Sequence, residues 1–304
     1  MMEQFMAFTG RNLKNYFRDK GAVFFSLLSM LIVILLMVFF LGDMYAQNIA
    51  SILGDFPGRD AAADRQNAEL LILSWNFAGI ISINAVTVTM AVYSVMIRDR
   101  VMGKLSSIYT APVSRGIITG GYIAAAWMAS VSVCAITLFI TEICGIIKGM
   151  EAFSLITHMK LLGLIGVNSF VYAALMYLVA VAAKTQGAWS SLGTVVGTLV
   201  GFLGGIYVPI GSLAPTIVTI IKCTPVIYGT SMFRIVMTEG IAETTFSGVP
   251  EEVLEAFCIE TGIHLEVFDR PIGITEEWLG LFACGVLLLI AGIMALKFGR
   301  KADR

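Results

Sequence analysis

Apolar runs of about 20 residues recur along the chain, and they constrain its fold more than any other feature. They lie near residues 21–42, 70–97, 116–141, 161–183, 187–208 and 278–296. A helix of that length rises about 30 Å, the thickness of the hydrocarbon layer of a bilayer, and only a helix pairs its own backbone groups there. The sequence predicts an all-α membrane protein with six transmembrane helices in a single transmembrane domain, residues 1–304.

The remaining polar sequence offers little room for catalysis. Charged residues make up 13% of the chain, about half the share found in soluble domains. There is no G-x-x-x-x-G-K-[ST] phosphate-binding loop. Gly103 and Lys104 could be its glycine and lysine, but arginine occupies position 98, where the motif requires its first glycine. The G-x-S-x-G and H-E-x-x-H arrangements of hydrolases and metalloproteases are also missing. We therefore expect no enzyme, and no cofactor or metal on this chain.

The charges divide between the two faces of the predicted bundle. Both termini and the second-to-third and fourth-to-fifth connections carry thirteen of the 20 basic residues and four acidic ones, a net charge of +9. The other three connections carry seven basic and 17 acidic residues, a net charge of −10. Because cytoplasmic loops are enriched in Lys and Arg, we expect both termini in the cytoplasm and the chain in a bacterial inner membrane.

The N-terminal segment, residues 1–20, is predicted to be an amphipathic interface helix. Its apolar residues share one arc at helical spacing, and its polar side carries the candidate contacts Arg11, Asn12, Lys14 and Arg18. This basic face would meet lipid phosphates or a partner. A simple orienting flank for the first span is the alternative.

The cytoplasmic segment 98–115 mixes charges with apolar residues at helical spacing, and Pro112 ends the pattern. We expect a short amphipathic helix that docks a soluble partner; a linker lying on the membrane remains the alternative. The residues proposed to couple to that partner are Arg98, Asp99, Arg100, Gly103, Lys104, Leu105, Ile108, Pro112 and Arg115.

Two features bear on packing and on the outer side. Four glycines spaced four apart in the fifth run, Gly193, Gly197, Gly201 and Gly205, would let another helix approach closely, within this chain or in a second copy. Prolines then interrupt residues 209–236, which predicts re-entrant outer helices followed by an acidic extracellular loop, together spanning 209–277. Within that loop, the stretch from Pro250 to Gly262 reads as a helix.

The spans contain neutral polar residues but lack charge, whereas ion-coupled carriers keep an ionisable group near the middle of the membrane. Asn76, Asn84 and Thr87 in the second run are therefore pathway candidates for an amphipathic or lipophilic cargo. Hydrogen bonding between helices is the alternative role for each of them.

Three stretches together resemble the membrane subunits of type 2 ABC transporters. FTGRNLKNYFRDKGAVFFSLL (8–28) is similar to the family's interface helix entering its first span. RDRVMGKLSSIYTAPVSRGIITGGYI (98–123) is similar to its coupling helix, although Asp99 stands alone where many members carry an acidic pair. GGIYVPIGSLAPTIVTIIKCTPVIYGTSMFR (204–234) resembles its fifth span and re-entrant helices.

The resemblance implies a permease subunit of an ATP-driven exporter of drugs, peptides, lipids or glycans. By that resemblance, residues 98–115 would seat in a separate nucleotide-binding ATPase that holds ATP and magnesium. A second permease copy or a sister permease would complete the assembly, with the first and fifth spans at the seam; membrane lipids are the other partner, and no nucleic acid is expected. The alternative from another class is a self-sufficient secondary carrier, channel or membrane scaffold.

Overall fold

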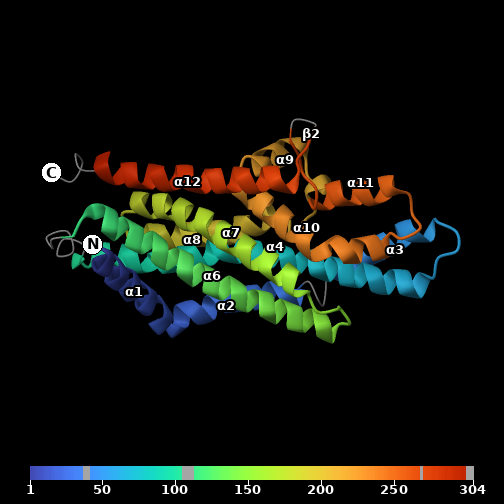
Figure 1. Ribbon diagram of the computed structural model, residues 1–304, viewed down its shortest axis with the longest axis horizontal. Helices are drawn as coiled ribbons and strands as arrows, with labels where there is room; N and C mark the ends of the chain where they lie inside the picture. The colour runs from blue at the N-terminus through green and yellow to red at the C-terminus, as the bar shows by residue number, and fades with distance from the viewer. Residues whose placement is uncertain (37–41, 105–112, 268–269, 299–304) are drawn as a thin grey trace.

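The computed structural model describes residues 1–36, 42–104, 113–267 and 270–298. These residues form an elongated helical bundle with one small antiparallel hairpin, β1 (Glu266–Val267) and β2 (Arg270–Pro271) (Figure 1). The helices, in chain order, are α1 (Met2–Arg18), α2 (Lys20–Leu36), α3 (Gly42–Gly54), α4 (Ala61–Val101), α6 (Arg115–Ile147), α7 (Leu155–Ala182), α8 (Gln186–Leu203), η2 (Ile210–Ser212), α9 (Pro215–Lys222), α10 (Pro225–Thr245), α11 (Glu251–Thr261) and α12 (Ile274–Phe298).

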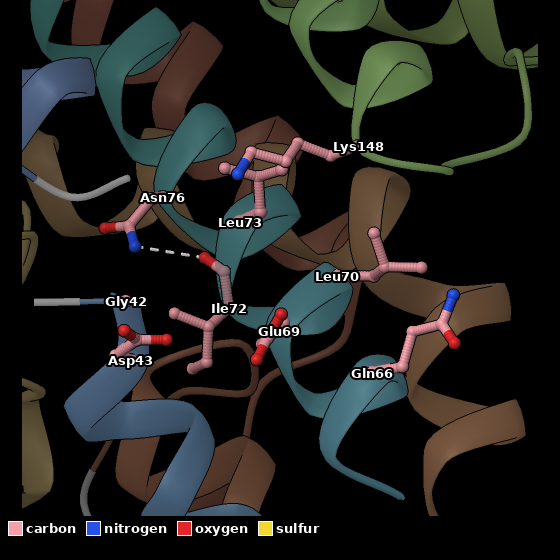
Figure 2. Close-up of a pocket in the computed structure, with 9 residues that line it drawn as sticks. All are labelled: Gly42, Asp43, Gln66, Glu69, Leu70, Ile72, Leu73, Asn76 and Lys148. Atoms are coloured by element: carbon pink, nitrogen blue, oxygen red, sulfur yellow. Dashed lines mark hydrogen bonds between the residues drawn. The ribbon is translucent and has the colours of Figure 1, made fainter. Parts of the chain in front are cut away.

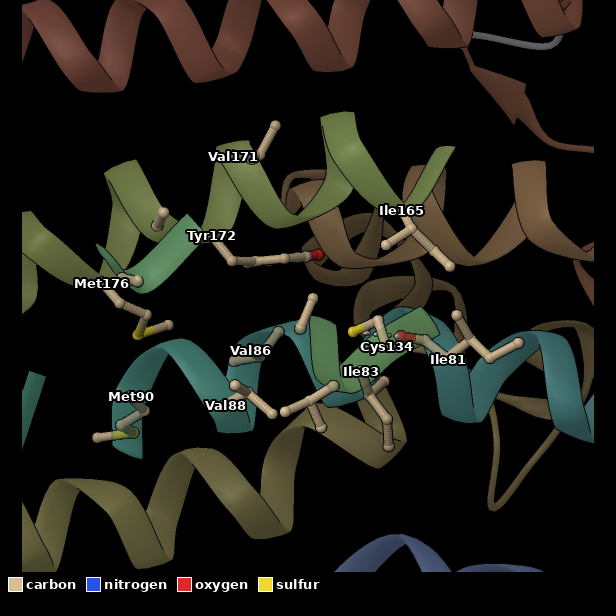
Figure 3. Packing of buried hydrophobic residues seen from close by; sticks show 14 of the residues in the cluster. Ile81, Ile83, Val86, Val88, Met90, Cys134, Ile165, Val171, Tyr172 and Met176 are labelled. Atoms are coloured by element: carbon tan, nitrogen blue, oxygen red, sulfur yellow. Dashed lines mark hydrogen bonds between the residues drawn. The ribbon is translucent and has the colours of Figure 1, made fainter. Parts of the chain in front are cut away.

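Helix α4 is the centre of the bundle. It is 41 residues long, roughly 60 Å at the usual helical rise, and its apolar and polar side chains are buried on all sides. Helices α2, α3, α6, α7, α8 and α10 all pack directly against it. Figure 3 shows one layer of this core, in which side chains of α4 such as Ile81, Val86 and Met90 lie near Tyr172 and Met176 of α7.

Polar residues in the connections begin four of the long helices. Each of these residues directs its side-chain oxygen to a backbone N–H of the first turn, which supplies a partner that the helix itself cannot provide. They are Asp60 before α4, Ser114 before α6, Ser154 before α7 and Thr185 before α8.

Four helices of the described residues are long and apolar enough to cross a membrane: α4, α6, α7 and α12. They match the second, third, fourth and sixth predicted runs in length and composition, although α4 begins nine residues before the predicted run. Two bent pairs qualify only when joined, α1 with α2 at 72° and α9 with α10 at 87°. The described chain thus holds four spans, or up to six if each pair counts as one.

The predicted first and fifth spans differ from the helices observed. Helix α2 accounts for 20–36 of the predicted 21–42 span, and the rest of that span lies outside the described residues. Helix α8 has 18 residues and ends at Leu203, before the predicted limit of 208, and it is not one of the four spans. Polar residues of α8, among them Gln186, Ser190 and Ser191, lower its mean hydropathy, and the helix stops before Gly204 and Gly205.

The outer segment corrects part of the prediction. Helix α9 is short, with 8 residues, as expected for this segment. Helix α10 has 21 residues and ends at Thr245, beyond the predicted limit of 236, and its buried residues pack along α4 over this added length. Pro215 and Pro225 each stand in the first turn, where the missing N–H costs nothing. The helix predicted between Pro250 and Gly262 is confirmed as α11, which ends at Gly262 with a φ of 68°.

Different helices form the two ends of the bundle. At one end lie α1 and the C-terminal end of α12, so both termini are on the same side (Figure 1). At the other end α3, the start of α4, the end of α10 and α11 share a second apolar cluster around Leu53, Leu71 and Phe246. Arg59 joins this end, since it pairs with buried Asp64 at 2.6 Å and donates to the carbonyls of Thr245 and Ser247.

The close approach of α10 to α4 and α7 predicts a stability difference between two glycines of the same helix. A Cβ at Gly229 would lie 2.4 Å from Oδ1 of buried Asn168, whereas a Cβ at Gly240 would meet nothing within 4 Å. We expect Gly229→Leu to cost about 1–3 kcal/mol of stability by overpacking and Gly240→Leu to leave stability nearly unchanged. Thermal midpoints of the two purified variants in lipid nanodiscs measure this, and equal midpoints would contradict the packing described.

Candidate functional site

The basic end of the bundle contains a buried ion pair that joins three helices. The guanidinium of Arg11 on α1 lies 2.8 Å from the carboxylate of Asp99, in the last turn of α4. The hydroxyl of Tyr122 on α6 donates to the same carboxylate oxygen at 3.2 Å. The Asp99 side chain is only 4% exposed, so this pair is screened far less than a surface ion pair. We call Arg11, Asp99 and Tyr122 the anchor cluster.

Small residues on α6 allow α1 to reach this position. Gly120 and Gly121 leave room for the rings of Phe5 and Phe8, and a Cβ at Gly121 would lie 2.6 Å from the Phe8 ring. Phe8 also packs edge-on against Tyr122, with ring centroids 5.0 Å apart. Helix α1 therefore docks on α6 through its aromatic residues.

This docking changes the roles of two predicted interface residues. Asn12 is 1% exposed and faces the bundle, and Arg11 is directed at Asp99. Neither residue belongs to an exposed basic face, because Arg11 pairs with Asp99 and Asn12 is buried between α1 and the bundle. Lys14 and Arg18 remain at least partly exposed, as the prediction of a basic face requires.

The first residues of the predicted coupling segment belong to α4. Arg98 to Val101 form its last turn, and Arg100 donates to the carbonyls of Ala180, Val181 and Ala183 at the end of α7. Cations at a helix C-terminus satisfy its unpaired carbonyls and its negative dipole end. Arg98 makes a looser pair with Asp19, at 3.8 Å. Asp99 and Arg100 thus brace neighbouring helices of this chain.

The chain then turns away from α4 and presents exposed side chains. Val101 and Met102 are 57% and 61% exposed, Gly103 has a φ of 71°, and Lys104 is exposed. Leu105, Ile108 and Pro112 lie outside the described residues. Arg115 begins α6. Exposed apolar residues beside a basic group at the end of a rigid helix form a surface to which a soluble partner can bind.

One of the three pathway candidates in α4 bonds to another helix. Asn84 donates to the hydroxyl of Thr137 on α6 at 2.8 Å, whereas Thr87 donates to the carbonyl of Asn84 within α4. The Asn84 bond is typical of helix-to-helix packing in a membrane. Asn76 donates to the carbonyl of Ile72, while its own oxygen has no protein partner among the described residues.

Asn76 also lines a small hollow toward the outer end, with a volume of about 100 Å³. Figure 2 shows it with Asp43 of α3, Glu69 of α4 and Lys148 beyond the end of α6. These charged residues make the hollow polar. Of the three pathway candidates, Asn76 is the one placed beside such a space.

The four predicted glycines do not act as one stripe. Gly193 lies near Met90 of α4, and Gly201 receives the ring of Tyr207. Gly197 has no neighbour within 4 Å, so this part of α8 faces away from the bundle. Gly205 lies beyond the end of the helix with a φ of 60°, and its carbonyl accepts from Arg234. Intrachain packing and an open face are therefore both present along α8.

Sequence reasoning missed the most deeply buried charge. Arg234 on α10 is fully buried, with its guanidinium 4.0 Å from the Trp75 ring. It donates to the carbonyls of Gly205 and Thr261, and the Trp75 indole donates to Thr261 as well. In the sequence, the signal for this site is a single arginine within the apolar segment 209–236, which prolines interrupt.

Comparison with known families identifies the chain. The sequence model of the ABC-2 type transporter family matches residues 3–238, which is more than half of the chain. This chain belongs to the ABC-2 type transporter family. As such it is a multi-pass membrane protein and a permease of an ABC transporter, the class inferred from the three motif stretches. A search of curated proteins gives no match.

The ABC-2 match ends within α10. It covers α1 to α9, including the anchor cluster and the turn after α4, but α11, the hairpin and α12 lie beyond it. The anchor cluster and the Val101–Lys104 turn therefore lie within family sequence, while α11, the hairpin and α12 do not.

The anchor cluster predicts that Asp99 contributes to the docking of α1, in addition to the contacts of Phe5 and Phe8 with α6. Asp99→Asn removes the countercharge of half-buried Arg11, so the docking of α1 should weaken by about 1–2 kcal/mol. Amide hydrogen exchange of α1 should then accelerate roughly tenfold, since 1.4 kcal/mol corresponds to a factor of ten. The matched control is Asp19→Asn, whose partner Arg98 is 3.8 Å away and 45% exposed. Equal exchange in both variants would rule out the anchor role.

Proposed function

We propose that this chain is the membrane subunit of an ATP-driven exporter, powered by a separate ATPase that docks at its basic end. The observation that carries the proposal is the anchor cluster, which fixes the interface helix to the same turn of α4 that leads into the exposed Val101–Lys104 segment. Force applied to this segment would reach α1, α6 and α7 together. ATP and magnesium belong to the partner, because the chain has no phosphate-binding loop.

Helix α4 would transmit the movement. It runs as one unbroken helix from the basic end to the outer cluster, and a buried helix responds to force as a rigid element. Near its outer end, Trp75 contacts Arg234, which in turn holds the backbone before α9 and after α11. A shift of α4 would therefore disturb the outer segments, where cargo leaves in the proposed mechanism.

The assembly is proposed to contain a second permease, either a copy of this chain or a sister subunit. Helix α8 exposes Val195, Leu199 and Phe202 on one face, and α2 exposes Leu31 and Leu35. Exposed apolar faces of this kind are available to a helix of another subunit in lipid. The basic end carries most of the Lys and Arg, so it would face the cytoplasm together with both termini, and the chain would lie in a bacterial inner membrane.

A self-sufficient carrier is the second candidate, and one observation favours it. Buried ionisable groups mark ion and proton pathways in membrane proteins, and this chain buries Arg234 and Glu277. Transport by proteoliposomes that contain the chain alone would support the carrier. Transport that requires both ATP and the ATPase encoded beside it would support the exporter of amphipathic or lipophilic cargo.

Two glycines at opposite ends provide a matched test of coupling. Gly103 and Gly58 both have positive φ, 71° and 83°, and a Cβ at either would meet open space. Replacing either with Val imposes a similar local strain of about 1–2 kcal/mol, but only Gly103 lies beside the proposed docking surface. We expect Gly103→Val to reduce ATP-driven export at least fivefold and Gly58→Val to leave it within twofold. Export unaffected by Gly103→Val, or a tagged chain that never recruits an ATPase, would contradict the proposal.

A further inference from the structure

A hollow of about 610 Å³ lies where α9 meets α10, beside the hairpin and the first turns of α12. Its walls are largely apolar and include Pro225, Tyr228, Ile272, Gly280 and Leu281. In Figure 1 these elements converge at the start of α12, away from the basic end. Most of this site follows residue 238, so it lies largely beyond the family match. A hollow of this size and character suits a small lipophilic ligand.

One carboxyl group in this wall lacks a full set of partners. Glu277 on α12 is 2% exposed yet lines the hollow. Its Oε1 lies 3.1 Å from the hydroxyl of Ser231, and its Oε2 has no hydrogen-bond partner among the described residues. Buried carboxylates are normally paired or fully hydrogen-bonded.

Ser231 cannot supply what Glu277 lacks. A serine hydroxyl donates one proton, and this hydroxyl lies closer to the carbonyl of Ile263, at 2.7 Å, than to Glu277. If it donates to Ile263, a carboxylate at Glu277 receives nothing from it. A proton on Glu277 would complete the chain of bonds from Glu277 to Ser231 to Ile263. A cation in the hollow would instead compensate the ionised carboxylate directly.

The one basic side chain among the described residues of the wall is already engaged. Arg270, which also lines the hollow, pairs with Glu276 at 3.1 Å and is 76% exposed. Tyr228 presents its ring to the same space, and its hydroxyl is held by the carbonyl of Lys222. Aromatic faces attract cations that have lost water. The hollow thus offers one uncompensated buried acid and one fixed aromatic ring.

We propose that this hollow binds a lipophilic monovalent cation, with Glu277 as its countercharge and Tyr228 as part of its aromatic and apolar wall. The site requires no ATPase and no second subunit, so it stands whether or not the chain is an exporter. Binding and ATP-driven transport are separate measurements, and each can fail alone.

The test is equilibrium binding of ethidium, a permanently charged aromatic cation, to the full chain in nanodiscs of uncharged lipid, with empty nanodiscs subtracted. The wild-type chain should bind saturably. Glu277→Gln keeps the side-chain shape and can donate to Ser231, but it lacks the charge, so it should weaken ethidium binding at least tenfold. Glu252→Gln, which alters an exposed carboxylate of α11 outside the hollow, should remain within twofold.

Two further measurements separate charge recognition from damage to the hollow. N-phenyl-1-naphthylamine, an uncharged aromatic probe, should bind Glu277→Gln as well as it binds the wild type. Gly280→Leu should weaken binding of both probes, because a Cβ there points into open space at the wall of the hollow. The proposal is overturned by a wild type that shows no saturable ethidium binding, by equal losses in Glu252→Gln and Glu277→Gln, or by equal losses of both probes in Glu277→Gln.

Discussion

The need to satisfy the polar groups of one buried helix organises this bundle. Between residues 71 and 97 helix α4 is buried among other helices, so water cannot serve most of the polar side chains there. Ser74 donates to the carbonyl of Met237, Asn84 to the hydroxyl of Thr137, and Tyr93 to the carbonyl of Ala173. These bonds specify the positions of α10, α6 and α7 around α4. Apolar packing then fills the spaces between them.

The same helix carries a charged contact toward each end. At the basic end Asp99 accepts from Arg11 and Tyr122; toward the outer end Trp75 covers the guanidinium of Arg234. Neither charge is left in lipid, where an unpaired ion costs several kcal/mol. A permease driven from one side needs a stiff connection to the other, and α4 with its two charged contacts supplies one in the proposed mechanism.

Hydropathy was sufficient to find the buried and spanning helices, because a bilayer requires runs of known length. Capping chemistry was sufficient for α11, where Pro250 and Gly262 mark both ends. Hydropathy failed for the start of α4, since residues 61–69 are polar and gain their helical order from α3, α10 and α11. It also predicted that the helical segment containing α10 ends at residue 236 and that Glu277 lies in a loop, whereas α10 ends at Thr245 and Glu277 lies in α12.

The candidate site was predicted less completely than the fold. The segment from Arg98 to Lys104 lies within the ABC-2 type family match, and its coupling role stays a prediction. The sequence did not reveal the partners of Arg11, Asp99 and Arg234. Arg11 and Asp99 are far apart in sequence, and Arg234 donates to backbone carbonyls, which no residue type marks. A single sequence shows which residues are charged, but it does not show which distant group pairs with each one.

The central claim is that a second protein binds the turn after α4. A photo-crosslinking amino acid placed at Met102, which is 61% exposed at the basic end, tests it directly in cells that also express the neighbouring ATPase. Ile52 on α3, 45% exposed at the opposite end, provides the comparison position. The account predicts an adduct with the ATPase from Met102 and none from Ile52. An adduct from Ile52, or none from Met102, would contradict it.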